Sequence, residues 1–232
     1  MNTVQIGDKT FKYSLKRKSI NSIRLKLNSR QSFEITCPHL TPQFFLNRFI
    51  SQNSNWILKN SQKITEYPSL KSLKSLSILG DKYQFIITKS TKESVIINRN
   101  EHKIYLYSSR FSELHLKTLF EKEFRKISLS LIRYHLQLLA SHYGFYYKRV
   151  SVRNQRTRFG SCSSHNSLNF NWQVIFFPLD KFRHLLLHEL THLEVKNHSP
   201  KFYQKLGEYD PSYKTNNRWL SSQGKKNFIL KP

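Results

Sequence analysis

The sequence contains few cysteines, few acidic residues and no long apolar run. Only Cys37 and Cys162 occur, and two cysteines do not make the disulfide framework that holds small secreted domains together. The first twenty residues are polar and basic without an apolar block, which argues against a signal peptide. No apolar run approaches the roughly 20 residues of a membrane-spanning helix. These absences predict a soluble protein of the cytoplasm.

The scarcity of acidic residues leaves the chain strongly basic. There are 39 Lys plus Arg against 14 Asp plus Glu, for a formal net charge of +25. A field of this sign attracts polyanions such as nucleic acid, although a solvated basic surface without such a partner fits the composition equally well. Apolar residues make up 38% of the 232 residues, which is enough for a sizeable core.

Hydrophobic patterning predicts an α+β chain. Apolar and polar residues alternate, as in half-buried strands, in segments 11–15, 23–27, 33–37, 83–88, 95–97 and 103–107. A helix is expected after Thr41-Pro42, and a long amphipathic helix between Ser112 and Gly144. No internal repeat at a fixed period is apparent. We therefore predict a β-rich N-terminal subdomain with one or two helices over residues 1–110, and a catalytic domain over residues 111–232.

The expected helix after Thr41-Pro42 carries several large apolar side chains. We expect them to pack towards a core: Phe45, Phe49, Trp56 and Ile57. In the second half, a strand is expected at 147–152 and an extended run at 168–177, ended by Pro178. This run could form an edge strand to which a substrate peptide adds through main-chain hydrogen bonds. The alternative is an ordinary buried strand of the sheet.

A metal-binding motif lies in a segment that we expect to be helical from Asp180, its N-cap, to about Lys196. The motif is His188-Glu189-Leu190-Thr191-His192. Histidines four residues apart lie one turn apart on one helix face, so both imidazoles can bind a single ion. Glu189 is rotated about 100° from His188 and therefore lies beside the ion, where a general base for water is needed. The alternative is a coincidental pair of histidines on a solvated face.

A catalytic zinc needs a third protein ligand and leaves a fourth position for water. His198 follows His192 just beyond the expected end of the helix, and a turn at Asn197 would return it to the metal. His184, one turn before His188, is the competitor. A straight helix spreads His184, His188 and His192 over about 12 Å, which is too far for all three to bind one ion. We therefore expect one Zn²⁺ per chain on His188, His192 and His198, with His184 in a supporting or surface position.

Several further residues are weaker candidates. Arg156 and Arg158 could stabilise an oxyanion, hold an anionic partner or form structural salt bridges. Cys162 and His165 have the spacing of a second metal site, although a buried small cysteine is the more common explanation. Tyr203 could line the cleft, although an aromatic residue in this position is more often a packing residue.

Five blocks of the sequence together resemble a known family. They are Arg158–Ser163, Leu168–Trp172, Pro178, His188–His192 and Asn197–Tyr203. Their order and spacing, over about residues 147–211, resemble the YgjP-like metallopeptidases, which are zincin-type proteins similar to the SprT and WLM groups. Phe159 and Tyr203 stand where the family usually has tryptophan, so these departures affect packing rather than chemistry.

The resemblance implies a zincin-like catalytic domain with a His-Glu-x-x-His helix and a small mixed or antiparallel sheet. It also implies His188, His192 and His198 as metal ligands and Glu189 as the catalytic residue, and Arg158, Asn171 and Tyr203 are added as candidates that support the site or bind substrate. The SprT and WLM groups are associated with proteins crosslinked to DNA, which fits the basic charge by analogy.

We therefore expect a zinc-dependent peptidase that acts on proteins or peptides, including DNA-associated ones. The competing hypothesis is a basic nucleic-acid-binding protein with a structural or vestigial metal site. Its binding surface would comprise the basic stretches 12–18 and 148–158, with the tyrosines of segment 143–147 nearby. No feature of the sequence predicts an oligomeric state.

Overall fold

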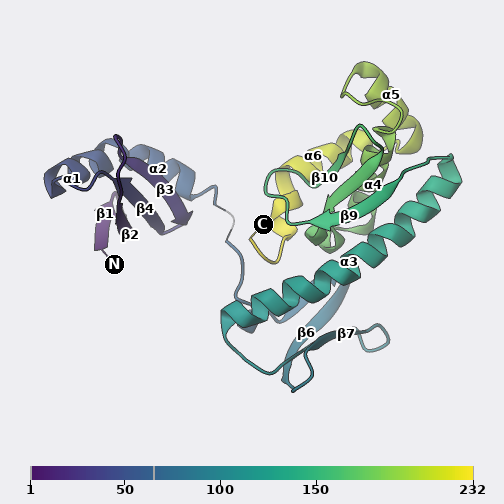
Figure 1. Ribbon diagram of the computed structural model, residues 1–232, viewed down its shortest axis with the longest axis horizontal. Helices are drawn as coiled ribbons and strands as arrows, with labels where there is room; N and C mark the ends of the chain where they lie inside the picture. The colour runs from purple at the N-terminus through teal and green to yellow at the C-terminus, as the bar shows by residue number, and fades with distance from the viewer. Residues whose placement is uncertain (1, 65, 232) are drawn as a thin grey trace. The chain divides into compact units, whose positions relative to one another are not determined.

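The computed structural model of the protein describes residues 2–64 and 66–231, so residues 1, 65 and 232 of the two expected domains lie outside the described residues. The described chain forms two compact units, Met1–Glu66 and Tyr67–Pro232 (Figure 1). Among the described residues, no helix is both long enough and apolar enough to cross a membrane.

The first unit is a four-stranded sheet with two helices on one face. Its elements are β1 (Asn2–Ile6), β2 (Lys9–Arg17), β3 (Arg24–Ser29), β4 (Ser32–Cys37), α1 (Gln43–Gln52) and α2 (Ser54–Ser61). The strand order is β1-β2-β4-β3, and only the central β2 and β4 are parallel. The strand expectations for segments 11–15, 23–27 and 33–37 are confirmed, because alternate residues such as Phe33 and Ile35 are buried.

The helical face of this unit differs from the expectation. The chain forms two helices that meet at Asn53, and Leu46, Ile50 and Ile57 point into the core. Phe45 and Trp56 remain 54% and 48% exposed, so the expectation that both pack into the core is wrong. Leu46 and Ile50 lie one turn apart on one helix face, and this spacing overrides the preference of the larger aromatics for burial.

The second unit contains two further sheets, the remaining helices and the short 3₁₀ turns. Its first part comprises η1 (Leu70–Ser72), β5 (Ser75–Ile78), β6 (Asp81–Lys89), β7 (Ser94–Asn98), β8 (Lys103–Ser108) and α3 (Glu113–Tyr143). Its second part comprises β9 (Arg149–Arg153), β10 (Gly160–Cys162), β11 (Ser167–Asn171), η2 (Trp172–Phe176), α4 (Leu179–Thr191), α5 (Pro200–Tyr209), α6 (Tyr213–Gln223) and η3 (Gly224–Asn227).

The sheet of β5 to β8 repeats the sheet of the first unit. Its order, β5-β6-β8-β7, again has a parallel central pair and antiparallel outer pairs. Phe33, Ile35 and Cys37 of β4 correspond to Ile104, Leu106 and Ser108 of β8, all buried and alternating in the same way. The sequence analysis found no repeat because few positions keep the same residue, whereas the pattern of buried positions is kept.

Helix α3 connects the layers of the second unit. It begins after Ser112, whose side chain accepts a hydrogen bond from the amide of His115, and ends at Gly144, as the sequence predicts. Along its length it contacts β7 and β8 on one side and β9, η2 and α4 on the other (Figure 1). Phe120 lies fully buried at this junction, against Phe85 and Trp172.

This packing explains why the compact units divide at residues 66 and 67, whereas the sequence suggested a division at 110 and 111. The sheet of β5 to β8 covers α3, and the two share one hydrophobic core with the second half of the chain. Because α3 buries one face of this sheet, the sheet and α3 belong to the same compact unit.

The expected extended run at 168–177 is wrong in its second half. The chain forms β11 only to Asn171 and then turns into the 3₁₀ helix η2. Asn171 causes the change, because its side chain accepts a hydrogen bond from the amide of Gln173 and caps η2. β11 is the central strand of the sheet β10-β11-β9, so of the two alternatives left by the sequence the ordinary buried strand is correct and the edge strand is not.

Candidate metal centre and cleft

Helix α4 carries the first half of the motif-derived site. Its apolar side, with Phe182, Leu186 and Leu190, is fully buried, and His188 and Glu189 lie on other faces. Pro178 stands at the N-cap position instead of Asp180, which lies in the first turn. The helix ends at Thr191, earlier than the expected Lys196, and His192 occupies its C-cap position.

The early end of α4 lets the chain turn back before α5 and brings His198 to the other two histidines. One potential ligand atom from each of His188, His192 and His198 lies within 4.8 Å of the others, and Nε2 of His188 is 3.0 Å from Nε2 of His198. Phe202 of α5, fully buried, packs against all three rings at centroid distances of 4.5–4.9 Å. The three imidazoles therefore converge and all pack against the ring of Phe202.

The electrostatics of His188 and His192 favour neutral imidazoles. Burial, and secondarily the neighbouring histidines, lower the pKa of His188 to about 3. Burial also lowers the pKa of His192, whose Nδ1 lies 3.0 Å from the carbonyl oxygen of Val195. A donating Nδ1 fixes the tautomer that leaves Nε2 free to ligate.

The donor set fits a divalent metal ion. Ligands about 2.0–2.1 Å from a tetrahedral zinc lie about 3.4 Å from one another, and the observed separations are of this order. Three imidazoles are ligands that zinc accepts readily, and all three line one cleft, where a water molecule could take the fourth position of a bound ion. No other group of three potential ligands occurs among residues 2–64 and 66–231.

Glu189 lies beside the three histidines and is only 4% exposed. Burial raises the pKa of its carboxyl group to about 8, against a smaller opposing effect of the Arg158 charge. Its Oε2 has no hydrogen-bond partner among the described residues. Gly160 of β10 makes room for it, because a Cβ at this position would come within 2.6 Å of Oε1 of Glu189. The carboxylate thus lies buried beside the histidines, in space that Gly160 leaves, with Oε2 free of protein partners among the described residues.

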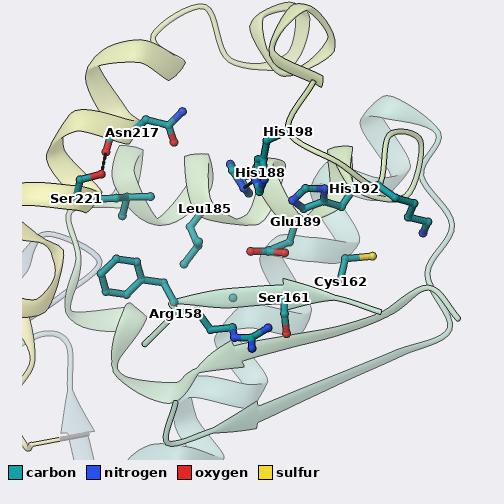
Figure 2. A pocket seen from close by; sticks show the side chains of 14 residues that line it. Arg158, Ser161, Cys162, Leu185, His188, Glu189, His192, His198, Asn217 and Ser221 are labelled. Carbon is teal, nitrogen blue, oxygen red and sulfur yellow. Dashed lines mark hydrogen bonds between the residues drawn. The ribbon is translucent and has the colours of Figure 1, made fainter. Parts of the chain in front are cut away.

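The site opens into a cleft of about 480 Å³ between β10, α4 and α6 (Figure 2). Its lining residues are Arg158, Phe159, Gly160, Ser161, Cys162, Leu185, His188, Glu189, His192, Lys196, His198, Asn217, Leu220 and Ser221. β10 is an edge strand and lines the cleft, in the place that one of the two interpretations gave to 168–177. The contribution of α6 was missed, because nothing in its sequence distinguishes a cleft-lining helix from a surface helix.

The further candidates from the sequence lie in different places. Arg158 lines the cleft. Asn171 is fully buried outside it and donates to the carbonyl oxygen of Gln155. Tyr203 does not line the cleft either, and its ring lies 6.2 Å from that of His198. Cys162 lines the cleft as a free, partly buried thiol whose pKa is raised by burial.

Two histidines near the site make other bonds. Nδ1 of His165 lies 3.2 Å from the hydroxyl of Ser164, on the exposed side of the chain. His184 is 1% exposed, so of the supporting and surface positions expected for it the surface position is excluded. Its two ring nitrogens lie 2.6 Å from Asp210 and 3.0 Å from Asn217.

Comparison with known proteins bears on the family. No curated protein matches the chain. Among solved structures, it is similar to the metallopeptidase zymogens jannalysin of Methanocaldococcus jannaschii and abylysin of Pyrococcus abyssi. The first is 19% identical over 40% of this chain and 95% of that chain, with a TM-score of 0.36. The second is 18% identical over 39% of this chain and 92% of that chain, with a TM-score of 0.36.

The model of the YgjP-like metallopeptidase domain matches residues 21–223, and the chain therefore belongs to the YgjP-like metallopeptidases.

Proposed function

We propose that this metallopeptidase is a zinc enzyme that holds one Zn²⁺ on His188, His192 and His198 and uses Glu189 as general base. The observation that carries the proposal is the convergence of three imidazoles within 4.8 Å beside one buried carboxylate. A structural zinc site usually has four protein ligands, whereas three ligands beside an open cleft are typical of a catalytic one.

Bound zinc lowers the pKa of water and polarises a carbonyl group. The chain itself supplies the remaining steps. Glu189 accepts a proton from the attacking water and passes it to the leaving amine. The raised pKa of this carboxyl group in the metal-free site reflects its burial, and a nearby dication favours the ionised form that a base needs.

A peptide substrate fits the edge strand of the cleft. β10 pairs with β11 through one edge only, so its other edge offers main-chain donors and acceptors to an extended peptide. Arg158 and Lys196 add positive charge to the cleft wall. Binding through main-chain hydrogen bonds would accept many sequences, with acidic side chains preferred near these two residues.

The test combines metal analysis with hydrolysis of fluorescein-labelled casein. We expect one zinc per chain in the purified protein and its loss in His198→Ala. Glu189→Gln should keep the zinc and lose hydrolysis by about a thousandfold or more, because the ligands remain while the base is gone. Retained hydrolysis in Glu189→Gln contradicts the assignment of the base.

The same measurements, with a DNA-binding measurement added, distinguish the peptidase from the nucleic-acid-binding function suggested by the net charge of +25. A nucleic-acid-binding protein with a structural or vestigial metal would contain zinc, hydrolyse no casein and bind labelled DNA with an affinity that falls steeply as salt rises. Zinc-dependent hydrolysis together with salt-sensitive DNA binding would support a peptidase that acts on DNA-associated proteins.

A further inference from the structure

A partly buried hydrogen-bond chain leads from the end of α5 to the cleft through His184. Nδ1 of His184 lies 2.6 Å from Oδ2 of Asp210, and Nε2 lies 3.0 Å from Oδ1 of Asn217. Asp210 immediately follows α5, His184 is on α4, and Asn217 is on α6. The three side chains therefore connect three helices around one side of the metal centre.

The direction of this chain is set at the Asp210 end. Asp210 is held by the side-chain amide of Asn216, which donates to Oδ2 at 2.8 Å, and by the backbone amide of Ser212, which donates to Oδ1 at 3.0 Å. Lys181 donates in turn to Oδ1 of Asn216 at 2.6 Å. A carboxylate surrounded by donors accepts from Nδ1 of His184, so this ring nitrogen carries a proton.

The other end of the chain points towards the cleft. Oδ1 of Asn217 faces Nε2 of His184 at 3.0 Å. An amide oxygen only accepts, so in this arrangement Nε2 carries a proton in addition to the one on Nδ1. Nδ2 of Asn217 then remains as a donor, and it has no hydrogen-bond partner among the residues that the structure describes. Asn217 lines the cleft on the wall opposite β10 (Figure 2).

We propose that Asn217 binds the substrate, donating a hydrogen bond from Nδ2 to a main-chain carbonyl oxygen of the bound peptide, and that His184 and Asp210 position it. The inference rests on the proposed peptidase function. A fixed amide donor favours a carbonyl acceptor, because little entropy is lost in orienting it when the substrate arrives. β10 and Asn217 then hold the peptide from two sides of the cleft.

The first test changes Asn217 in two ways and uses a matched amide-to-acid change elsewhere on α6 as its control. Asn217→Asp keeps the acceptor for His184 and replaces only the donor, whereas Asn217→Ala removes the whole amide. Both should lower kcat/KM for labelled casein by about tenfold or more, with the zinc content unchanged. The matched control is Gln223→Glu, which makes the same chemical change at an exposed position of the same helix, away from the cleft lining, and should stay within about twofold of the parent. Equal activity in Asn217→Asp and the parent overturns the inference.

A binding measurement separates this inference from the peptidase function. In the zinc-loaded Glu189→Gln protein, which does not turn over, the Kd for labelled casein should rise about tenfold when Asn217→Ala is added and should not change with Gln223→Ala. If the parent protein hydrolyses nothing while this binding still depends on Asn217, the proposed function fails and the inference stands. If casein is hydrolysed and its binding ignores Asn217, the inference fails alone.

The positioning role has a readout of its own. Long-range ¹H–¹⁵N NMR spectra of the His184 ring should show protons on both nitrogens in the parent. Asp210→Asn should change the Nδ1 signal and lower kcat/KM by about three- to tenfold while the circular dichroism spectrum stays the same. A ring protonated on Nδ1 alone means that Asn217 turns its oxygen to the cleft, which overturns the proposal.

Discussion

The first sheet, β1 to β4, and the second sheet, β5 to β8, have the same strand order, the same strand directions and the same alternation of buried residues. They differ in what covers them. Two short helices, α1 and α2, close the first sheet into a separate unit, whereas the 31-residue helix α3 joins the second sheet to the layers that hold the metal centre.

The comparison teaches that topology alone does not decide the role of a sheet. The same four-stranded arrangement is a self-contained unit in one place and a supporting layer of the site in the other, according to the length of the helix that follows it. Changes in the second sheet or in α3 should therefore reach the metal centre, and equivalent changes in the first sheet should not.

The largest effect is expected when one large buried side chain is truncated in each of the two hydrophobic cores. Phe120→Ala empties a fully buried position where α3 meets both the second sheet and η2, and should destabilise the second unit by about 3–5 kcal/mol. Phe33→Ala, at 1% exposure in β4, should cost the first unit about as much. Zinc content and thermal unfolding by calorimetry separate the two, because only Phe120→Ala should lower the zinc content. An equal loss of zinc in Phe33→Ala would show that the units are coupled.

A smaller effect, confined to the chemistry, is expected at Gly160. An alanine there would push against Glu189, with contacts of 2.6–2.9 Å to three atoms of its side chain. We expect Gly160→Ala to lower kcat by about a hundredfold, similar to removal of a transition-state contact, while the three histidines still bind zinc. Gly207→Ala is the matched control, since its nearest neighbour is the ring of Tyr213 at 3.2 Å. Normal activity of Gly160→Ala would show that Glu189 can work from another position.

The smallest effect is expected at the helix starts that follow the two sheets. The Ser112 hydroxyl caps α3, and Ser112→Ala should cost the second unit about 1 kcal/mol. Thr41, its counterpart before α1, does not cap the helix and instead donates to the carbonyl oxygen of Pro38. Thr41→Ala should therefore cost the first unit about half as much. Urea unfolding of both variants measures the difference, and a larger cost for Thr41→Ala would reverse the comparison.

The sequence predicted what depends on local pattern. Strand alternation and the caps at Ser112 and Gly144 indicated the correct elements, and the four-residue spacing of His188 and His192 brought both to one face at the end of α4. The position of His198 beside them also followed from a turn after the helix, although the helix ended earlier than expected.

What the sequence could not predict depends on contacts between distant segments. The repeated sheet was hidden because burial is kept while residues change. The edge position of β10 instead of β11 arises from pairing with β9, which no local pattern encodes. The clearance that Gly160 gives Glu189 and the burial of His184 against Asp210 likewise require the assembled helices.

The partly buried Cys162 on the cleft wall has a practical consequence, because the other thiol, Cys37, is fully enclosed. A maleimide dye or spin label would attach at a single point of the unaltered chain, on the wall of the cleft that Glu189 also lines. The slow reaction expected of a thiol with a raised pKa leaves time to stop after one attachment. A label on Cys162 would therefore report on the entry of a substrate into the cleft without an engineered cysteine.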